Sequence, residues 1–529
     1  MEEKHHVSGN IIEGSVKAPT NCKNENGLYG FWFNLEIDQK ADSVVEKGSV
    51  IWYYFKAGKG TIVNVKTSIS SISPSQAGMD RQAEIGGAKF EEIRTRATAS
   101  WDEKLGKITV TGNPEYVKLF YTHYYHSMLS PSDISSPSGN YRGSDNIQYH
   151  AKGYVHYHGW SIWDNFRTEF PLLTITEPVV MNDICRSLCD LYREGKVQMS
   201  TKTEPFPTAR TEHAIVVMLD CLEKGINRFD IESVYPLMVR EVEDNPWSTP
   251  DKKLETAYDY WAMSRIATLL NKKEDAKRFL SMAAKYKEIW REKFMVMDDK
   301  SDIMHGDGLY EGTLWQYRWF VPFDIKGVMD MLGGRQVFTM QLQQFFDENL
   351  YNHGNEPDIH VPFLFNLTDR PYESQRIVNQ ILTKPTRQNY GTHVKWKVPY
   401  TGRIYKNDPA GYMPEMDDDA GTMSAWYVLA SMGIFPVCVG EPVYALTAPI
   451  FSSVNIQLPG NKSFRIIARN LSEDNFYIQG VTLNGKKLTR SWISHQEITG
   501  GGTLEFTLGN TPSKTWGTSG QFVPGIDTK

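Results

Sequence analysis

The strongest constraint on the fold is a long series of amphipathic helical segments between Trp160 and Gly433. Apolar residues return every three or four positions in stretches such as LETAYDYWAMSRIATLLNKK, DAKRFLSMAAKYKEIWREKF and YESQRIVNQILTKP. The segments share no fixed repeat length of the kind that marks a solenoid. Many paired helices in one large unit fit a closed toroid of helical hairpins as well as a bundle. A toroid would gather its connecting loops at one end.

Strand patterns flank this helical region on both sides. Residues 27–73 are rich in β-branched and aromatic types, as in GLYGFWFNLEI and SVIWYYFKAG, and similar patterns return after Pro436. The segment LNGKKL predicts a type I′ hairpin, because Asn-Gly supplies the positive φ angles of that turn. Whether the two β regions form one sandwich or two separate units is left open. We predict a multidomain α and β protein with a short N-terminal β-sandwich portion at 1–80, a helical toroid at 81–435 and a C-terminal β-rich region at 436–529.

Charge and hydropathy exclude several classes of partner. The formal net charge is −6, and Lys and Arg are scattered, so no electrostatic footprint for nucleic acid is present. No apolar run reaches the roughly 18 residues of a membrane span, and the first residues, MEEKHHVSGN, do not read as a signal peptide. We therefore expect neither nucleic acid nor a membrane as a partner. The oligomeric state is left open.

Cysteine usage gives no framework for the fold. Cys22, Cys185, Cys189, Cys221 and Cys438 are too few for a disulfide scaffold in a chain of 529 residues. Cys185 and Cys189 lie four positions apart in a predicted helix without a matching His cluster, which favours helix packing over zinc binding.

Polar and aromatic residues are concentrated in four predicted loops of the helical region. No phosphate loop, zincin motif or nucleophile elbow is found among them. The loops have carboxylates in common, and acids from several loops at one end of a toroid would converge in a cleft. The residues are Trp163, Asp164 and Arg167; Glu311, Trp315 and Gln316; Asn355, Glu356, Asp358 and His360; and Asp417 to Asp419.

Two carboxyl groups on either side of a bond are the requirement for glycoside hydrolysis. Glu311 lies among Tyr310, Leu314 and Trp315, whose apolar surroundings would favour the protonated form that a general acid needs. The aspartate triplet is the better base, and its crowded charges need a divalent cation or an Arg as partner. Each feature also has a structural explanation. The triplet fits a helix N-terminus equally well, Glu311 fits a buried ion pair, and His213 fits a core histidine.

Taken together, these segments resemble family-92 glycoside hydrolases. The similarity extends from VNVKTSISSISPSQAG to ISHQEITGGGTLEFTLG. It is strongest in WSIWDNFRTEFPLLTITEP, LETAYDYWAMSRIA, EGTLWQYRWFVPFDIKGVMDMLGG, GNEPDIHVPFLFN and DDDAGTMSAWYVLASMGIFPVCVG. Members of that family are calcium-dependent, exo-acting, inverting α-mannosidases in which a β-sandwich precedes an (α/α)6 barrel. The resemblance implies the same architecture, a Ca²⁺ cofactor that holds the mannose hydroxyls, a glycan or mannan substrate, and a bacterial periplasmic or extracellular location.

The resemblance also implies roles for residues at matching positions. It gives Glu311 as the general acid and Asp417 and Asp419 as the acidic positions that supply the base. It implies substrate binding by Trp163, Asp164, Arg167, His213, Trp315, Gln316 and Glu356, and calcium binding by Asn355 and Glu356, to which we add Asp358 as a possible ligand.

The chain departs from the family pattern at several points. It has RTEHA where relatives have a Gly before the His, Thr422 where they usually have Gln, and an unusual loop at residues 388–415. The N-terminal β region is also shorter than is usual in the family. These departures leave the mannosidic linkage open. They also keep two alternatives: a catalytically weak carbohydrate-binding relative, and an (α/α)6 glycosidase for another sugar.

Overall fold

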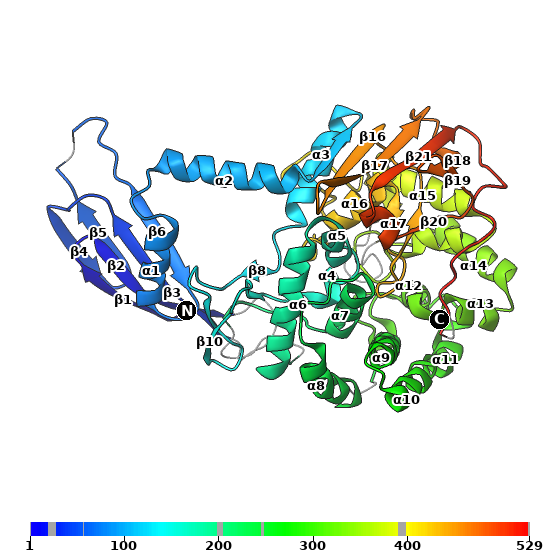
Figure 1. Ribbon diagram of the computed structural model, residues 1–529, viewed down its shortest axis with the longest axis horizontal. Coiled ribbons are helices and arrows are strands. Elements are labelled where there is room, and N and C mark those ends of the chain that lie inside the picture. Colours follow the sequence, from blue (N-terminus) through cyan, green and yellow to red (C-terminus); the bar gives the residue numbers. More distant parts are fainter. Residues whose placement is uncertain are drawn as a thin grey trace.

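A computed structural model describes residues 2–19, 28–56, 58–197, 205–244, 248–389 and 398–526. Cys22 and residues 390–397 of the unusual loop lie outside these ranges. The chain forms a small N-terminal β unit, a ring of helices and a C-terminal sheet that packs on the ring, and a long helix joins the first unit to the rest (Figure 1). The ring confirms the predicted helical toroid.

The N-terminal unit is a four-stranded antiparallel sheet with strand order β1-β2-β3-β6. Its strands are β1 (Glu2–Ser8), β2 (Ile11–Pro19), β3 (Leu28–Ile37) and β6 (Val65–Ser70), and β4 (Ser43–Lys47) and β5 (Val50–Tyr54) form a separate hairpin. Helix α1 (Pro74–Glu84) packs against this sheet, where Arg81 Nε donates to Asn34 Oδ1 at 3.0 Å. The domain boundary drawn at residue 80 therefore falls inside α1, and β1 and β2 were not predicted from the sequence.

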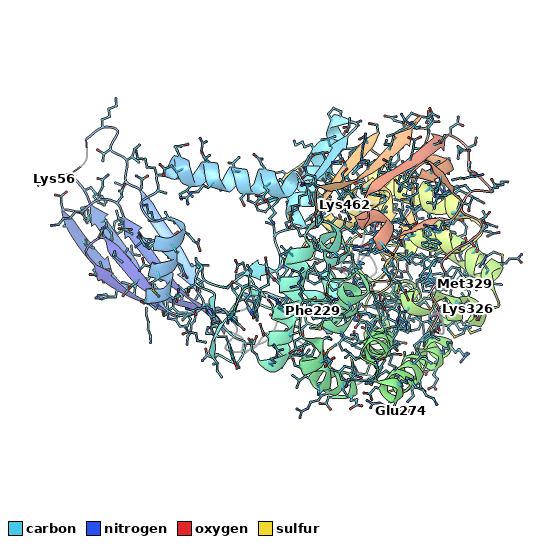
Figure 2. The ribbon with its side chains drawn as sticks, viewed as in Figure 1. Lys56, Phe229, Glu274, Lys326, Met329 and Lys462 are labelled. Atoms are coloured by element: carbon cyan, nitrogen blue, oxygen red, sulfur yellow. The ribbon has the colours of Figure 1, made fainter. Side chains whose placement is uncertain are left out.

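Helix α2 (Phe90–Leu105) connects the two parts of the molecule and has no buried residue (Figure 2). A second link is made by Arg142, which lies on β9 (Asn140–Arg142) beside the ring. Its guanidinium donates to the carbonyls of Ser71 at 2.6 Å and Gly30 at 2.9 Å, both in the N-terminal unit. Direct hydrogen bonds, and not only α2, thus connect this unit to the ring.

The ring is built from helices of two kinds. Helices α5, α7 and α16 are buried along their whole length or nearly so, as expected for inner helices, whereas α6, α8, α10 and α15 are amphipathic and lie outside. Helix α16 contacts both α3 and α5, which closes the ring. The helices are α3 (Pro114–His126), α4 (Ile162–Asn165), α5 (Glu169–Thr176), α6 (Pro178–Arg193), α7 (Ala214–Glu223), α8 (Ile231–Asp244), α9 (Pro250–Leu269), α10 (Lys273–Ala283), α11 (Tyr286–Ile289), α12 (Leu314–Tyr317), α13 (Ile325–Met331), α14 (Arg335–Asp347), α15 (Pro371–Thr383) and α16 (Thr422–Met432).

The C-terminal region forms a six-stranded sheet with order β19-β18-β21-β17-β16-β7. Its edge strand β7 comes from far earlier in the chain and pairs with β16. This sheet shares no strand with the N-terminal sheet β1-β2-β3-β6, so the N-terminal and C-terminal β regions form separate sheets and not one sandwich. Asn484 (φ 51°) and Gly485 (φ 77°) connect β18 to β19, which confirms the predicted hairpin turn. The strands are β7 (Ile108–Thr111), β16 (Ser453–Leu458), β17 (Lys462–Arg469), β18 (Tyr477–Leu483), β19 (Lys486–Leu488) and β21 (Gly502–Gly509).

Two further predictions from the sequence concern the cysteines and the absence of membrane-spanning helices. Cys185 and Cys189 are buried free thiols on α6, which agrees with helix packing, and Cys221 and Cys438 are also free and buried. Among the described residues, no helix has both the length and the apolar character needed to cross a bilayer.

Candidate active site

Four loop segments that are far apart in the sequence are joined by hydrogen bonds at one place on the ring. The Arg167 guanidinium donates to the Glu356 carbonyl at 3.4 Å, which joins the loop around α4 to the Asn-Glu-Pro segment. The Asn355 side-chain amide donates to the Glu311 carbonyl. Asn165 Nδ2 donates to the Ala420 carbonyl at 2.8 Å, 255 positions away. The structure therefore brings together the four carboxylate-bearing segments singled out from the sequence.

The aspartate triplet divides into different environments. Asp418 accepts a hydrogen bond from the Ser424 main-chain N–H at 3.0 Å, and its main-chain carbonyl accepts from Gly421 and Met423, so it secures the start of α16. Asp417 is exposed. Asp419 is half-buried and adopts a left-handed backbone with φ 48°. The capping interpretation thus holds for Asp418, whereas Asp419 lies near other carboxyl groups and its assignment as the base stays a prediction.

Asp164, Glu356 and Asp419 form a group of interacting acids. Burial, and then the charge of Asp164, raise the pKa of Asp419 to about 8, although hydrogen bonding with Glu356 opposes this change. Burial and the charges of Asp419 and Asp164 hold the pKa of Glu356 well above its usual range. Burial also raises the pKa of Asp164 to about 6, against the opposing effects of Ser161 and Arg167. We refer to these three residues as the acid cluster.

Glu356 is the most deeply buried member of the acid cluster. Neither carboxyl oxygen accepts from an amide, a hydroxyl or a basic side chain of the described residues, and its polar neighbours are the carboxyl groups of Asp164 and Asp419. Carboxyl groups buried side by side are costly unless a cation or a proton neutralises their charge. Its two oxygens are therefore available as ligands for a hard cation.

Glu311 lies at the edge of the acid cluster. Its charge contributes to the raised pKa of Asp419, so the two side chains are within electrostatic range of each other. The residue is half-buried and has a φ of 48°, a conformation that is unfavourable for a residue with a Cβ atom. Its N–H donates to His305 Nδ1 at 3.2 Å, and its carbonyl accepts from Asn355. These bonds on both sides hold the backbone in this conformation.

The three predicted calcium ligands do not have equivalent positions. Asp358 accepts from the Asn352 N–H at 3.0 Å, which braces its own loop, and Asn355 uses its amide N–H on Glu311. Among the described residues, no group of three or more His, Cys, Asp and Glu side chains is arranged to hold a metal. A calcium site built on Glu356 would therefore need main-chain or amide oxygens and water as further ligands.

The other side chains singled out from the sequence have different environments: the charge of Arg167 acts on the acid cluster, whereas the rest make packing, capping or hydrogen-bond contacts with other residues. Arg167 lies over the Trp163 ring at 4.7 Å, and its Nη2 is buried without a hydrogen-bond partner among the described residues. His213 is buried and interacts with Asp259 through Nδ1 at 3.1 Å. The Gln316 side-chain oxygen accepts from the Thr313 N–H at 2.9 Å and so caps α12. Trp315 is buried next to Phe345, and His360 interacts with the Trp319 carbonyl at 2.9 Å.

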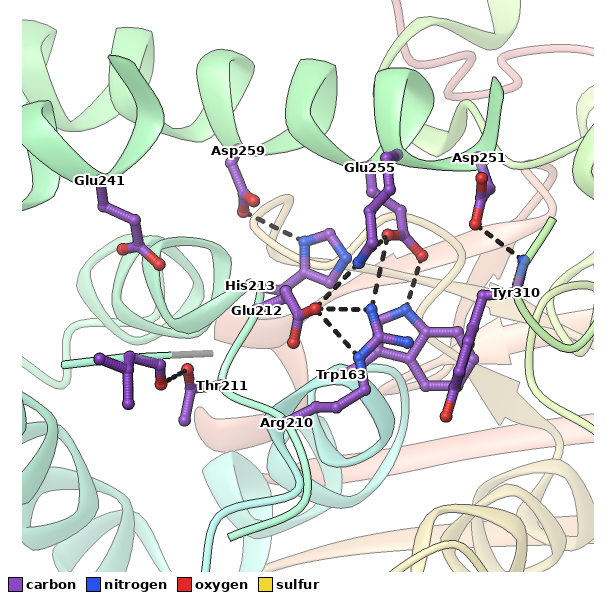
Figure 3. A network of polar contacts seen from close by, with 12 residues as sticks. Trp163, Arg210, Thr211, Glu212, His213, Glu241, Asp251, Glu255, Asp259 and Tyr310 are labelled. Carbon is purple, nitrogen blue, oxygen red and sulfur yellow. Dashed lines mark hydrogen bonds and ion pairs between the residues drawn. The ribbon is translucent and has the colours of Figure 1, made fainter. Parts of the chain in front are cut away.

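A network of charged residues beside the site was not predicted. The indole N–H of Trp163 donates to Glu255 Oε1 at 2.6 Å, and Arg210 donates to Glu212 Oε1 at 2.6 Å (Figure 3). Lys252 bridges Glu212 at 2.9 Å and Glu255 at 3.1 Å. The only sequence signal was the unusual RTEH segment, which contains Arg210 and Glu212. Glu255 lies in LETAYDYWAMSRIA, a segment noted for its helical pattern and for the family resemblance, but neither it nor Lys252 was singled out as a site residue.

Comparison with known proteins identifies the catalytic domain. A family model described as the glycosyl hydrolase family 92 catalytic domain matches residues 76–253 and 247–510. An uncharacterized secreted glycosidase of Arthroderma benhamiae is 25% identical and is matched over 91% of this chain. The chain spans 65% of the length of that relative.

Solved structures of the same family superpose well. The glycosyl hydrolase ccman5 is 26% identical, with a TM-score of 0.89 over 98% of this chain and 77% of its own. An inverting mannosidase from Bacteroides thetaiotaomicron is 22% identical, with a TM-score of 0.82 over 97% of this chain and 77% of its own. At that level of identity the second similarity concerns the fold.

Proposed function

Because the chain belongs to glycosyl hydrolase family 92, we propose that it is an exo-acting α-mannosidase that removes terminal α-linked mannose with inversion at the anomeric carbon. The observation that carries the proposal is the convergence of Glu311 with the acid cluster at one place on the ring. Solved structures of the family with this fold include one described as an inverting mannosidase, and we carry its sugar and its stereochemistry to this chain as parts of the proposal.

The reaction assigns different tasks to the two sides of the site. Glu311 donates its proton to the glycosidic oxygen as the bond to the anomeric carbon breaks. Asp419 takes a proton from a water molecule whose oxygen attacks that carbon from the opposite face. Asp419 is preferred to Asp417 as the base because it is partly buried and interacts with the acid cluster, whereas Asp417 is exposed. The products are free mannose in the inverted configuration and the shortened glycan.

Arg167 and Asp164 fit a role in holding the terminal sugar. The buried Nη2 of Arg167 has an unused donor, and a sugar hydroxyl is a suitable acceptor. Asp164 accepts from Ser161 and interacts with Arg167, so it can present a fixed carboxyl group to a second hydroxyl. These contacts would orient the sugar ring between the acid and the base.

The buried oxygens of Glu356, which accept from no amide, hydroxyl or basic donor of the described residues, fit a calcium ion, which prefers hard oxygen ligands. We propose that Glu356 holds the ion, with the side-chain oxygen of the preceding residue, Asn355, as a further ligand. When bound, the ion would supply a positive charge that attracts the sugar hydroxyls and offsets the charge of the acid cluster. Asp358 is a weaker candidate, because one of its oxygens already accepts from Asn352.

We propose that the substrate is a mannose-containing glycan or mannan outside the cytoplasm. The supporting observation is the description of the matched Arthroderma benhamiae relative as a secreted glycosidase.

The test is to measure mannose release from α-1,2-, α-1,3- and α-1,6-linked mannobiosides, with calcium and with a chelator. Nuclear magnetic resonance of the first product distinguishes the anomers. The proposal predicts β-mannose and a loss of activity on chelation. Initial formation of α-mannose would overturn inversion, and faster hydrolysis of another glycoside would overturn the sugar.

A further inference from the structure

Arg210 lies against the rings of Trp163 and Tyr310, which precede two candidate site residues. Its guanidinium carbon is 4.5 Å from the centre of the Trp163 ring and 4.3 Å from that of Tyr310 (Figure 3). The two rings meet edge to face, with centres 5.2 Å apart and an interplanar angle of 89°. Trp163 is followed directly by Asp164, and Tyr310 is followed directly by Glu311. Arg210 therefore joins the segment of one acid to the segment of the other.

The guanidinium has a fixed orientation. Arg210 is 6% exposed, and its Nε and Nη2 donate to Glu212 Oε1 at 3.0 and 2.6 Å. Glu255 lies 3.8 Å from Nη2 and also accepts from the Trp163 indole N–H. Because a guanidinium is planar, holding two of its nitrogens fixes the orientation of the group beside the rings.

The main chain of Tyr310 is held independently of Arg210. Its N–H donates to Asp251 Oδ2 at 2.9 Å, and its carbonyl accepts from the Tyr317 hydroxyl at 2.6 Å. Asp251 lies on α9, the same helix that supplies Glu255. The loop is thus anchored at its backbone, and the stacked guanidinium adds a second restraint at the Tyr310 side chain. The next residue, Glu311, has the unfavourable positive φ described above, so its direction depends on these neighbouring restraints.

We propose that Arg210 is a positioning residue that sets the direction of the Glu311 carboxyl relative to the sugar site by clamping Tyr310 against Trp163. This inference rests on the proposed function, in which Glu311 is the general acid. Arg210 does not touch the reacting atoms in this scheme. Its effect passes through the Tyr310 ring to the adjacent residue.

The test uses substrates that differ in their need for the acid. Methyl α-mannoside has a poor leaving group that must be protonated, whereas dinitrophenyl α-mannoside has a leaving group that departs without a proton. For Arg210→Lys, which keeps the charge but loses the planar stack, we expect kcat on methyl α-mannoside to fall about 10- to 100-fold. On dinitrophenyl α-mannoside we expect a change below about 3-fold, and KM should change little on both substrates.

Control variants separate this effect from a loss of stability. Arg265 also donates to two glutamates, at 2.7 Å each, and lies 5.6 Å from the Trp261 ring, but it does not belong to the site. Arg265→Lys should therefore show similar thermal destabilisation without any dependence on the leaving group. Tyr310→Ala should reproduce the pattern of Arg210→Lys, and the double variant should be no worse than Tyr310→Ala alone. Tyr310→Phe keeps the ring but loses a hydroxyl that interacts with Glu311 and Arg210, so a loss as large as that of Tyr310→Ala would assign the effect to the hydroxyl and overturn clamping through the ring.

The outcomes separate the two hypotheses. Equal losses on both substrates for Arg210→Lys would overturn the positioning role, provided that Glu311→Gln shows the leaving-group dependence. If Glu311→Gln itself affects both substrates equally, the general-acid assignment is wrong, and the proposal for Arg210 is overturned with it. Fully additive effects of Arg210→Lys and Tyr310→Ala would show that the guanidinium does not act through the ring.

Discussion

The side-chain amide of Asn355 donates to the main-chain carbonyl of Glu311, which joins two loops 44 positions apart in the sequence. Asn355 was predicted from the sequence as a calcium ligand, yet this bond uses its nitrogen and leaves only its oxygen for a metal. The same residue can therefore serve the acid loop with one atom and an ion with the other.

For Asn355→Ala we expect a loss of about 1–3 kcal/mol of stability, since the Glu311 carbonyl loses its donor, together with a lower kcat. Thermal unfolding and steady-state kinetics measure the two effects. Asn366→Ala is the matched control, because Asn366 is also buried and donates to a main-chain carbonyl, that of Leu446 at 3.1 Å. An equal loss of kcat in the control would show that general destabilisation explains the result.

The second prediction concerns the identity of the base. Asp419→Asn should reduce kcat by roughly 100- to 10,000-fold, as expected for removal of a general base. Asp417→Asn should have a much smaller effect, because Asp417 is exposed. Kinetics on a mannobioside at saturating calcium compares the two variants. The reverse order of effects would transfer the role to Asp417.

Activity should depend on pH through the protonation of Asp419. Its pKa is raised to about 8, and a base must be ionised, so without a neighbouring cation kcat/KM should rise with pH up to about pH 8. A positive ion at Glu356 favours the ionised form of Asp419, so it should move the rise of kcat/KM to lower pH. Profiles at several calcium concentrations check the shift. A limb near pH 4 at every concentration would contradict the raised pKa.

Glu356→Gln should increase thermal stability when calcium is absent. The pKa of Glu356 is raised in the folded protein, so the folded state retains the proton over a pH range in which the unfolded state has lost it. Its contribution to stability is therefore greatest below the unfolded pKa and falls as pH rises. At neutral pH we expect Glu356→Gln to raise Tm by roughly 1–3 °C. The variant should also lose stabilisation by added calcium, and a Tm that still rises with calcium would place the ion elsewhere.

Asp418→Ala should lower stability by about 1 kcal/mol, because the N–H of Ser424 loses its acceptor at the start of α16. Asp418→Asn retains a side-chain oxygen and should restore most of this loss. Calorimetric unfolding of both variants measures it. A loss of activity in Asp418→Asn without a change in stability would show a catalytic role instead.

Sequence analysis predicted the features that depend on local pattern. Helical periodicity indicated the ring, and Asn484 with Gly485 indicated a turn that the structure contains. Pairings between strands that lie far apart in the chain could not be predicted from local sequence patterns. The strand at Ile108–Thr111 is only four residues long and joins a sheet whose other strands follow residue 450, so no local signal could assign it.

In the candidate site, too, local sequence patterns could be interpreted, whereas contacts between distant segments could not be predicted. Segments rich in acids and aromatic residues could be recognised, and the structure brings them together. The separate environments of Asp418 and Asp419 could not be predicted, since adjacent identical residues carry the same local signal. The rings that Arg210 contacts lie 47 and 100 positions away in the numbering, so these contacts require the folded chain.

The exposed middle of the connecting helix has a consequence for how such proteins diverge. Residues 94–100 of α2 are all exposed, so substitutions there are constrained mainly by helical propensity and solubility. The end of the helix that follows is different, because the Trp101 ring lies 4.6 Å from that of Tyr125 and Lys104 lies 3.1 Å from Glu177. Arg142 likewise donates to carbonyl groups of the N-terminal unit. Over evolutionary time residues 94–100 should therefore change quickly, while Trp101, Lys104 and Arg142 change slowly.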